Sequence, residues 1–471
     1  MGDPSRYDAA PRVLLRHPDW AVNASMYQIN VRQFSAEGTF DAAAAQLPRL
    51  ADLGVKILWL MPVHEIGVLN RKGVLGSPYA VRDHYSVNPE LGTLGSLRAF
   101  VDAAHALGMY VILDWVANHT AWDHVLTTQH PQWYARDWKG DFCSTPWCAW
   151  EDIIDLDYAH AGLRRYMSEA MCHWVREVDV DGFRCDVAGY VPVDFWETAR
   201  ADLEAIKPVF LLAEWEDRDL HRAAFDATYA WRWNERLHQI CTRGENLDDL
   251  YGYYSWRDKA WPRDAYRLMF VSNHDKNAWE GTQFEQFGPG LEAAMVLSAI
   301  GDGMPLIYNG QEAGHDHRLA FFERDPILWR EHPHGTMYRR LVHLKLVNTA
   351  LWNGAAGAPM VDVDNDHHHR VLSFVRRHAS GDAVFAAFNF SPDTREVTFA
   401  DSPGEDGTAL RGPHHGCYVD LDDGHPVLVG PGWSLTMPPW TYRVLVAGRR
   451  TDTADSPLTP FDDSTGQQRS P

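Results

Sequence analysis

The chain has 471 residues, of which 45% are hydrophobic and 23% charged, a composition typical of folded globular proteins. Its length exceeds that of one ordinary domain, so we expect one large unit and a smaller one. The formal net charge of -21 disfavours nucleic acid and anionic membrane surfaces as partners, because like charges repel. No apolar stretch approaches the ~20 residues that a helix needs to cross a bilayer.

Residues 1–24 precede the first predicted strand and are interpreted as an N-terminal extension. Charged residues are spread through this segment and interrupt any continuous apolar stretch, so we expect no secretory signal. A cytoplasmic location is therefore predicted. The six cysteines lack the paired spacing of a zinc site and are expected to be free thiols in that compartment. Cys143 and Cys148 are close enough in sequence to form a bridge, and that pairing stays open.

Short apolar runs alternate with helical patterns from about residue 25 to 345. Alternation of this kind predicts an α/β fold with a parallel sheet, and eight runs predict a closed (β/α)8 TIM barrel over residues 25–118 and 161–350. The predicted strands are 25–31, 56–63, 110–113, 182–185, 209–213, 225–231, 267–271 and 305–308. Apolar residues at three- and four-residue spacings predict helices between them, for example over 40–53, 97–107 and 163–177.

Two regions depart from the alternation. Residues 119–160, after the third predicted strand, are irregular and rich in tryptophan, which predicts an ordered excursion domain that walls a cleft. Residues 355–447 contain alternating runs such as 371–375, 383–390 and 442–446, which predict an antiparallel β-sandwich domain at the C-terminal end. The polar segment 451–471 is expected to be disordered. Three consecutive histidines, 367–369, are typical of a solvated turn rather than a metal site.

Four of the predicted strands end at or beside a carboxylate, namely Asp114, Asp186, Glu214 and Asp275. The carboxyl ends of parallel barrel strands open on one rim, so these acids are expected to converge there. Several carboxylates at one mouth suit acid–base and nucleophilic chemistry on a neutral, hydroxyl-rich substrate. Cleavage of a glycosidic bond is therefore the first interpretation.

The surroundings of each carboxylate suggest different roles. Arg184 lies two residues before Asp186 on the same side of the strand, and a neighbouring cation lowers a carboxyl pKa and keeps a nucleophile ionised. Glu214 follows an apolar run and precedes Trp215, surroundings that raise a carboxyl pKa and favour a proton donor. Asp275 would be a third acid that opposes the positive charge of the transition state.

Four segments that contain these residues resemble, in order and spacing, the signatures of the α-amylase family of glycoside hydrolases, family 13. The segments are DWVANHT at 114–120, DGFRCD at 181–186, LLAEW at 211–215 and FVSNHD at 270–275. The sequences LGVKILWLMP at 53–62 and GMPLIYNGQE at 303–312 support the resemblance, which covers about residues 25–447. It implies Asp186 as nucleophile, Glu214 as general acid/base and Asp275 as transition-state stabiliser.

The resemblance also implies residues that contact the substrate. It assigns sugar contacts to Arg184, His119 and His274, and places Tyr79 beneath the sugar ring, where aromatic stacking suits its C–H face. Trp215, directly after Glu214, is also expected to contact the substrate. Asp114 is expected to contact the substrate, to brace Arg184 or to cap a helix, and these readings stay open.

The chain departs from the family at several positions. No cofactor is expected to be required, but many relatives bind a structural calcium through residues that correspond to Asn118 and Asp155. The histidine that completes that site is Tyr190 in this chain. Ala80 replaces an Asp found in many exo-acting members, and 188–190 lack the Lys-His pair of many endo-acting members.

The function that the resemblance implies is retaining hydrolysis of α-glucosidic bonds, mainly α-1,4, in maltooligosaccharides or α-glucans by double displacement. The alternatives are an α-glucosidase, or a transglycosylase or isomerase that acts on a disaccharide such as sucrose or trehalose. A non-catalytic binding protein of amylase type is disfavoured, because such relatives typically lose a catalytic acid and this chain retains all three.

Overall fold

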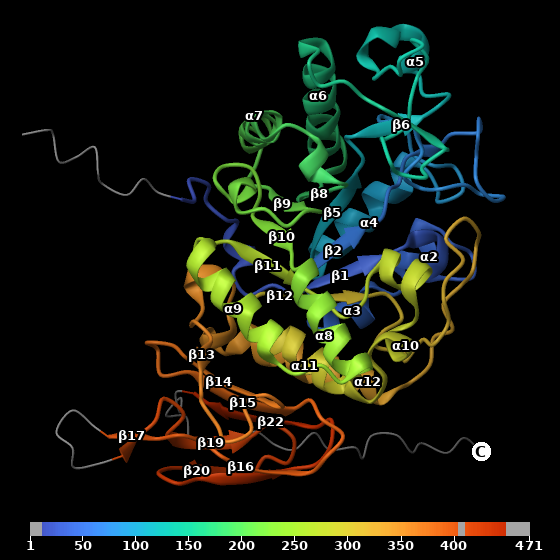
Figure 1. Cartoon of the computed structure of the whole chain (residues 1–471). Coiled ribbons are helices and arrows are strands. Elements are labelled where there is room, and N and C mark those ends of the chain that lie inside the picture. The colour runs from blue at the N-terminus through green and yellow to red at the C-terminus, as the bar shows by residue number, and fades with distance from the viewer. Residues whose placement is uncertain (1–11, 404–409, 449–471) are drawn as a thin grey trace, which may run out of the picture.

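Eight parallel strands close into a barrel in the computed structural model, which describes residues 12–403 and 410–448 (Figure 1). In chain order they are β1 (Met26–Ile29), β2 (Ile57–Leu60), β5 (Tyr110–Trp115), β8 (Gly182–Cys185), β9 (Phe210–Ala213), β10 (Ala227–Tyr229), β11 (Tyr266–Met269) and β12 (Met304–Tyr308). Each strand pairs with the next, and β12 closes the ring against β1, where Met26 lies opposite Leu306. The predicted (β/α)8 barrel is confirmed.

Helices cover the outside of the barrel (Figure 1). They are α1 (Val31–Phe34), α2 (Phe40–Ala44), α3 (Leu47–Leu53), α4 (Leu94–Ala106), α6 (Ala161–Val178), α7 (Val193–Glu204), α8 (Trp231–Arg243), α9 (Asp248–Ala260), α10 (Gln283–Phe287), α11 (Leu291–Ile300) and α12 (Pro333–Val347). The single helix predicted over 40–53 is two helices, because Pro48 has no N–H and sits in the first turn of α3. Among the described residues, none of these helices is both long and apolar enough to span a membrane.

The barrel strands are apolar on both faces, as expected for a parallel sheet covered by helices. Trp59, Phe210 and Leu212 belong to the cluster that fills the interior of the barrel. Leu58 and Leu211, one position along the same strands, belong to the layer between strands and helices. Because the interior is filled with side chains, chemistry is confined to the rim of the barrel.

The N-terminal segment packs against the barrel. The ring of Trp20, in the short helix η2 (Asp19–Ala21), stacks on Tyr110 with centroids 4.1 Å apart, and His17 stacks on Tyr266 at the same distance. Tyr110 and Tyr266 are the first residues of β5 and β11. The described part of the extension therefore covers the end of the barrel opposite to the carboxyl ends of the strands.

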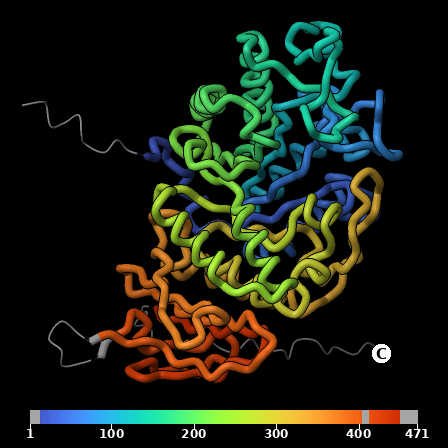
Figure 2. Tube along the Cα trace, in the orientation of Figure 1, coloured from blue at the N-terminus to red at the C-terminus, as the bar shows by residue number. Residues whose placement is uncertain are grey.

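The excursion after the third barrel strand contains a small antiparallel sheet of β6 (His119–Ala121) and β7 (Ile153–Asp155), with the short helices α5 (Leu126–Gln129) and η3 (Pro131–Trp133). A second hairpin, β3 (Glu65–Ile66) with β4 (Val81–Asp83), contacts β6. The excursion and the C-terminal strands lie at opposite ends of the molecule (Figure 2). All six cysteines are free thiols, Cys143 and Cys148 included.

The C-terminal domain is built from antiparallel sheets, as predicted. Its main sheet has the order β13 (Val361–Asp362), β14 (Val371–Arg377), β15 (Ala383–Asn389), β22 (Tyr442–Ala447), β19 (Gly416–Asp420) and β20 (Pro426–Val429). Two smaller pairs are β16 (Arg395–Thr398) with β21 (Ser434–Met437) and β17 (Ser402–Pro403) with β18 (Leu410–Arg411). Phe385, Val397 and Phe399 belong to the apolar cluster of this domain. The predicted tail, 451–471, lies outside the described residues.

A buried carboxylate joins the barrel to this domain. Asp302, just after α11, contacts Arg257, Arg263 at 3.1 Å and, from β14, Arg376 at 3.6 Å. Burial alone would raise the pKa of Asp302, but the three arginines lower it to about 2. The charge of Asp302 is therefore part of what holds the two units together.

We expect Asp302→Asn to lower the free energy of unfolding by about 3–5 kcal/mol at pH 7, because buried arginines lose their counter-charge. Denaturant titration measures this loss. Since folding depresses the pKa of Asp302, its contribution is expected to fade as the pH falls from about 4 to 2. Asp258→Asn is the control, because Asp258 is 57% exposed and pairs with Arg257 at 3.4 Å, so it should cost less than about 1 kcal/mol. Equal losses in both variants would contradict the assignment.

Candidate active site

One buried guanidinium joins three of the four predicted acids. Nη1 of Arg184 lies 2.8 Å from Asp114 Oδ1 and 2.9 Å from Asp186 Oδ1. Nη2 of Arg184 lies 2.9 Å from Glu214 Oε1, close enough for an ion pair although the N–H is not aligned as a hydrogen bond. The structure therefore brings Asp186 and Glu214 together at the barrel mouth, where both carboxylates contact the guanidinium of Arg184.

The backbone of the barrel accounts for this convergence. Asp114 on β5 is in register with Arg184 on β8, and Arg184 is in register with Leu212 on β9. Side chains alternate along a strand, so Glu214 continues the inward-facing row of Leu212 at the next inward position. Gly182 allows β8 and β9 to approach, because its φ is +148° and a Cβ there would lie 1.9 Å from the carbonyl oxygen of Phe210.

Glu214 is held from two sides. Its Oε1 faces Arg184, and its Oε2 accepts a hydrogen bond of 2.8 Å from the backbone N–H of Val187. Val187 adopts a left-handed backbone conformation with φ of 36°, which is strained for a β-branched residue. That strained turn directs an N–H at the carboxylate and fixes its orientation.

The mouth beside Glu214 is aromatic. Trp215 packs over Gly189, where a Cβ would lie 2.1 Å from the indole ring, so only glycine fits. The ring of Tyr190 lies 5.1 Å from that of Trp215 and is about half exposed. Together these rings form a surface next to the carboxylate.

Burial governs the protonation of the acids. It raises the pKa of Asp186 to about 7 and the pKa of Glu214 to about 8, while Arg184 acts in the opposite direction. Burial likewise raises the pKa of Asp114 to about 6. The prediction that Arg184 holds the Asp186 pKa below its usual range is wrong, because burial of the carboxylate raises its pKa by more than the shared cation lowers it. Glu214 is nevertheless the more basic of the pair, so it retains a proton where Asp186 is ionised.

A hydrogen-bonded chain runs from Asp114 to the first barrel strand. The hydroxyl of Tyr79 donates to Asp114 Oδ2 at 3.0 Å and lies 2.8 Å from Nε2 of His274. The side-chain amide of Gln28 lies 2.8 Å from Nδ1 of His274. Burial lowers the pKa of His274 to about 4, so the ring is neutral at pH 7. With Gln28 donating to Nδ1, the proton of the neutral ring is on Nε2, which also lies 3.2 Å from Asp275 Oδ2.

Asp114 braces Arg184. Besides Arg184 and Tyr79, its carboxylate accepts a hydrogen bond of 3.0 Å from the indole N–H of Trp59. Asp114 lies within strand β5, so the interpretation of this residue as a helix cap is wrong.

His119, on β6, is the excursion's contribution to the site. Its Nε2 lies 3.8 Å from Asp186 Oδ2, and burial lowers the His119 pKa to about 4. The ring of Trp150 lies 5.9 Å from that of His119, whereas Trp138 and Trp147 are exposed. Trp150 therefore lies next to His119.

Two aromatic residues beside the site were not predicted. Phe321 lies parallel to Tyr79 with centroids 6.2 Å apart, and Trp279 lies 5.2 Å from Phe321 and is 55% exposed. Phe321 lies in a loop and Trp279 in the short π-helical turn η6 (Lys276–Glu280), and neither segment has a periodicity that would have signalled them. Gln28 and Trp59 were also missed, although a polar side chain inside a predicted barrel strand could have pointed to Gln28.

Asn118 and Asp155, the residues implied for calcium, do lie together. Asp155 Oδ1 accepts hydrogen bonds from Asn118 Nδ2 at 3.3 Å and from Thr145 Oγ1 at 2.6 Å. Calcium takes about six to eight oxygen ligands, whereas this group offers one carboxylate whose near oxygen already accepts two hydrogen bonds. Tyr190, in the position of the third ligand, packs beside Trp215. The residues present do not fit calcium.

Comparisons with known proteins identify similar chains. A family model described as the catalytic domain of alpha amylase matches residues 21–250. The α-amylase MalA of Haloarcula japonica is 28% identical over 425 residues, which is 86% of this chain and 61% of that protein. An α-1,4-glucan:maltose-1-phosphate maltosyltransferase of Cereibacter sphaeroides is 34% identical over 325 residues, 62% of this chain and 52% of that protein. The chain spans about half the length of the curated relatives it matches.

Solved structures cover more of the chain. The maltogenic α-amylase AmyB of Thermotoga neapolitana is 30% identical with a TM-score of 0.81, covering 91% of this chain and 99% of that one. An α-amylase from Lactobacillus plantarum is also 30% identical, with a TM-score of 0.78 and the same coverage.

Proposed function

We propose that this chain, which belongs to the α-amylase family, is a retaining hydrolase of α-1,4-glucosidic bonds in maltooligosaccharides and α-glucans. The observation that carries the proposal is the contact of one buried guanidinium, Arg184, with both Asp186 and Glu214. Retention requires two carboxyl groups about 5 Å apart, one ionised and one protonated. The higher pKa of Glu214 supports its assignment as the protonated member.

In the first step a carboxylate oxygen of Asp186 attacks the anomeric carbon, while Glu214 gives its proton to the departing glycosidic oxygen. The products are a glycosyl ester on Asp186, a free hydroxyl on the leaving sugar and an ionised Glu214. In the second step Glu214 takes a proton from water, the water oxygen attacks the anomeric carbon, and Asp186 leaves as carboxylate. The configuration is inverted twice and is therefore retained.

Neighbouring groups stabilise the charge that develops between these steps. Asp275 opposes the positive charge of the oxocarbenium-like transition state. The neutral rings of His119 and His274 offer N–H donors to sugar hydroxyls, and Tyr79 presents an aromatic face to the sugar ring. Asp114 acts through Arg184 as a positioning residue. No step passes through a metal, because the donor set of Asn118 and Asp155 is too small for calcium.

The names of the relatives support α-glucans as substrates, since they describe α-amylases, a maltogenic α-amylase and maltosyltransferases. A second candidate is transfer of a glycosyl unit, such as maltosyl, to a sugar acceptor, which the 34% identity to a maltosyltransferase favours. The aromatic surface of Tyr190 and Trp215 beside Glu214 would hold such an acceptor as readily as a leaving sugar.

Product profiling of the full chain distinguishes these activities. We expect maltoheptaose and starch to be shortened, with sugars of α configuration seen first by proton NMR, and sucrose and trehalose to persist. Products longer than the maltoheptaose supplied would favour transfer over hydrolysis. Conversion of sucrose or trehalose to an isomer, or an initial product of β configuration, would contradict the proposal.

A further inference from the structure

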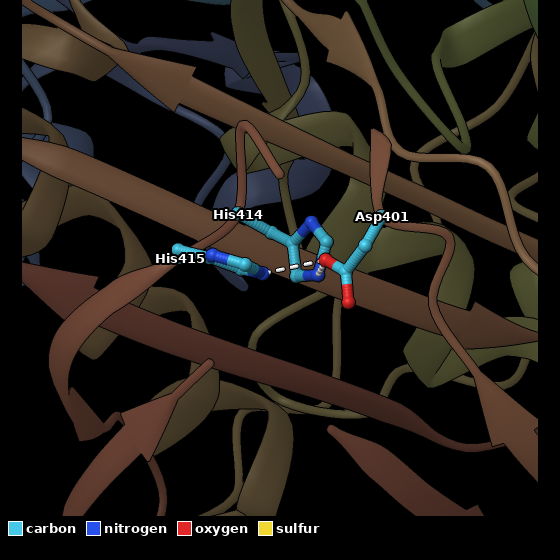
Figure 3. A group of neighbouring side chains, drawn as sticks. All are labelled: Asp401, His414 and His415. Carbon is cyan, nitrogen blue, oxygen red and sulfur yellow. Dashed lines mark hydrogen bonds and ion pairs between the residues drawn. The ribbon is translucent and has the colours of Figure 1, made fainter. Parts of the chain in front are cut away.

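A cluster of three side chains, Asp401, His414 and His415, lies in the C-terminal domain (Figure 3). Asp401 precedes β17, and His414 and His415 precede β19. One ligand atom from each of the three lies within 4.8 Å of the others. His415 Nε2 lies 2.6 Å from Asp401 Oδ1, and His414 Nε2 lies 3.8 Å from the same oxygen. Figure 3 shows both imidazole rings turned toward the carboxylate.

His414 is the unexplained member of this cluster. Its side chain is fully buried, and neither ring nitrogen has a hydrogen-bond partner within the described ranges. Phe385 and Phe399 lie about its ring, with centroids 6.0 Å and 5.9 Å away. A buried imidazole without partners is costly, so its place among apolar rings is not explained by packing alone.

Neighbouring residues fix the positions of Asp401 and His414. The backbone N–H of Gly432 donates to Asp401 Oδ2 at 2.8 Å, which leaves Oδ1 facing the two histidines. The hydroxyl of Tyr418 donates to the carbonyl oxygen of His414 at 2.9 Å. Gly412 admits the close approach, since a Cβ there would lie 2.4 Å from the His414 ring. The Gly432 contact therefore orients the carboxylate from behind, as is typical of ligating carboxylates, while the Tyr418 contact fixes the backbone of His414.

We propose that Asp401, His414 and His415 bind one Zn²⁺ through Asp401 Oδ1 and the Nε2 atoms of both histidines, with water as the fourth ligand. Imidazole and carboxylate donors suit zinc, whereas calcium and magnesium prefer oxygen ligands alone. Tetrahedral zinc with bonds of about 2.0–2.1 Å places its ligand atoms roughly 3.3 Å apart. The observed 2.6 Å and 3.8 Å lie on either side of that separation, so shifts of less than about 1 Å would complete the site.

The zinc would tie the segment at Asp401 to the turn at His414 and His415, and would therefore stabilise this domain rather than take part in catalysis. The alternative is that no metal binds, and that Asp401 and His415 form only a hydrogen-bonded pair.

Zinc titration of the full chain tests the proposal. After treatment with a chelator, the protein is titrated with Zn²⁺ against a chromogenic competitor, and the thermal midpoint is recorded with and without the ion. We expect one equivalent to bind and the midpoint to rise. His415→Gln and Asp401→Asn should each weaken binding more than about tenfold and remove most of the rise.

His425→Gln is the matched control, because His425 is 78% exposed and pairs with Asp423 outside the cluster, so zinc affinity should be unchanged. Co²⁺ added to the unaltered protein provides a second readout, since a four-coordinate site should give a visible absorption band. Absence of Zn²⁺ binding by the unaltered chain would overturn the proposal. So would an affinity in His415→Gln equal to that of the unaltered protein.

Discussion

Replacing Asp186 by asparagine is expected to lower kcat on maltoheptaose by at least about 10⁴-fold. The amide preserves the size of the side chain and its contact with Arg184 Nη1, 2.9 Å away, but it cannot form the glycosyl ester. The effect should appear in kcat more than in KM, because the lost interaction belongs to the bond-forming step. Release of reducing sugar measures it, and circular dichroism checks that the fold is intact.

Asp219→Asn is the matched control. Asp219 follows Glu214 along the chain in the short helix η5 (Arg218–His221) and its side chain is 78% exposed, so kcat should change less than about twofold.

Chemical rescue identifies the role of Asp186 itself. In Asp186→Ala, azide can occupy the space of the lost carboxylate and attack α-maltosyl fluoride directly, which yields a β-maltosyl azide after one inversion. An azide product of α configuration would indicate that another group forms the intermediate. A loss below about tenfold in Asp186→Asn would also remove Asp186 as the nucleophile.

The barrel and its acids were accessible from sequence because local patterns encode them. Apolar runs that end on a carboxylate give both the strand and the direction in which its last side chain points. As expected, Arg184 lies on β8 and Glu214 directly follows β9. The resemblance to the family supplied Tyr79, His119 and His274, which lie in loops or in the excursion.

Other features depend on contacts between distant segments. The pKa of Asp186 was predicted in the wrong direction. The neighbouring Arg184 is visible in sequence, whereas the burial of Asp186 and the sharing of Arg184 with Asp114 and Glu214 are properties of the fold. Phe321 adjoins Tyr79 from a loop more than two hundred residues away. Such pairings leave no local pattern.

The histidines illustrate the same limit. The run at 367–369 is conspicuous in sequence, yet His369 pairs with Asp248 at the surface, as expected of a solvated turn. His414 and His415 lie close to Asp401 without any repeated spacing in the sequence, and the burial of His414 appears only once the sheets of the domain are packed.

Replacing Glu214 by glutamine is expected to lower kcat on maltoheptaose by about 10²–10⁴-fold, because the leaving oxygen loses its proton donor. With α-maltosyl fluoride as substrate, the same substitution should lower the rate of the first step much less than with maltoheptaose, since fluoride departs without protonation. Stopped-flow release of fluoride measures that step alone. Glu204→Gln is the control, because Glu204 lies on α7, is 40% exposed and pairs with Arg200, so both substrates should be turned over as before.

The pH dependence of kcat/KM tests more directly than the rate loss whether Glu214 is the proton donor. In the unaltered chain the rate requires Asp186 ionised and Glu214 protonated, so kcat/KM should rise as Asp186 loses its proton near its pKa of about 7. It should fall as Glu214 loses its proton near its pKa of about 8. Glutamine has no proton to lose in this range, so the descending limb should vanish in Glu214→Gln while the ascending limb persists. A descending limb that survives the substitution, or equal losses on maltoheptaose and the fluoride, would assign the proton to another group.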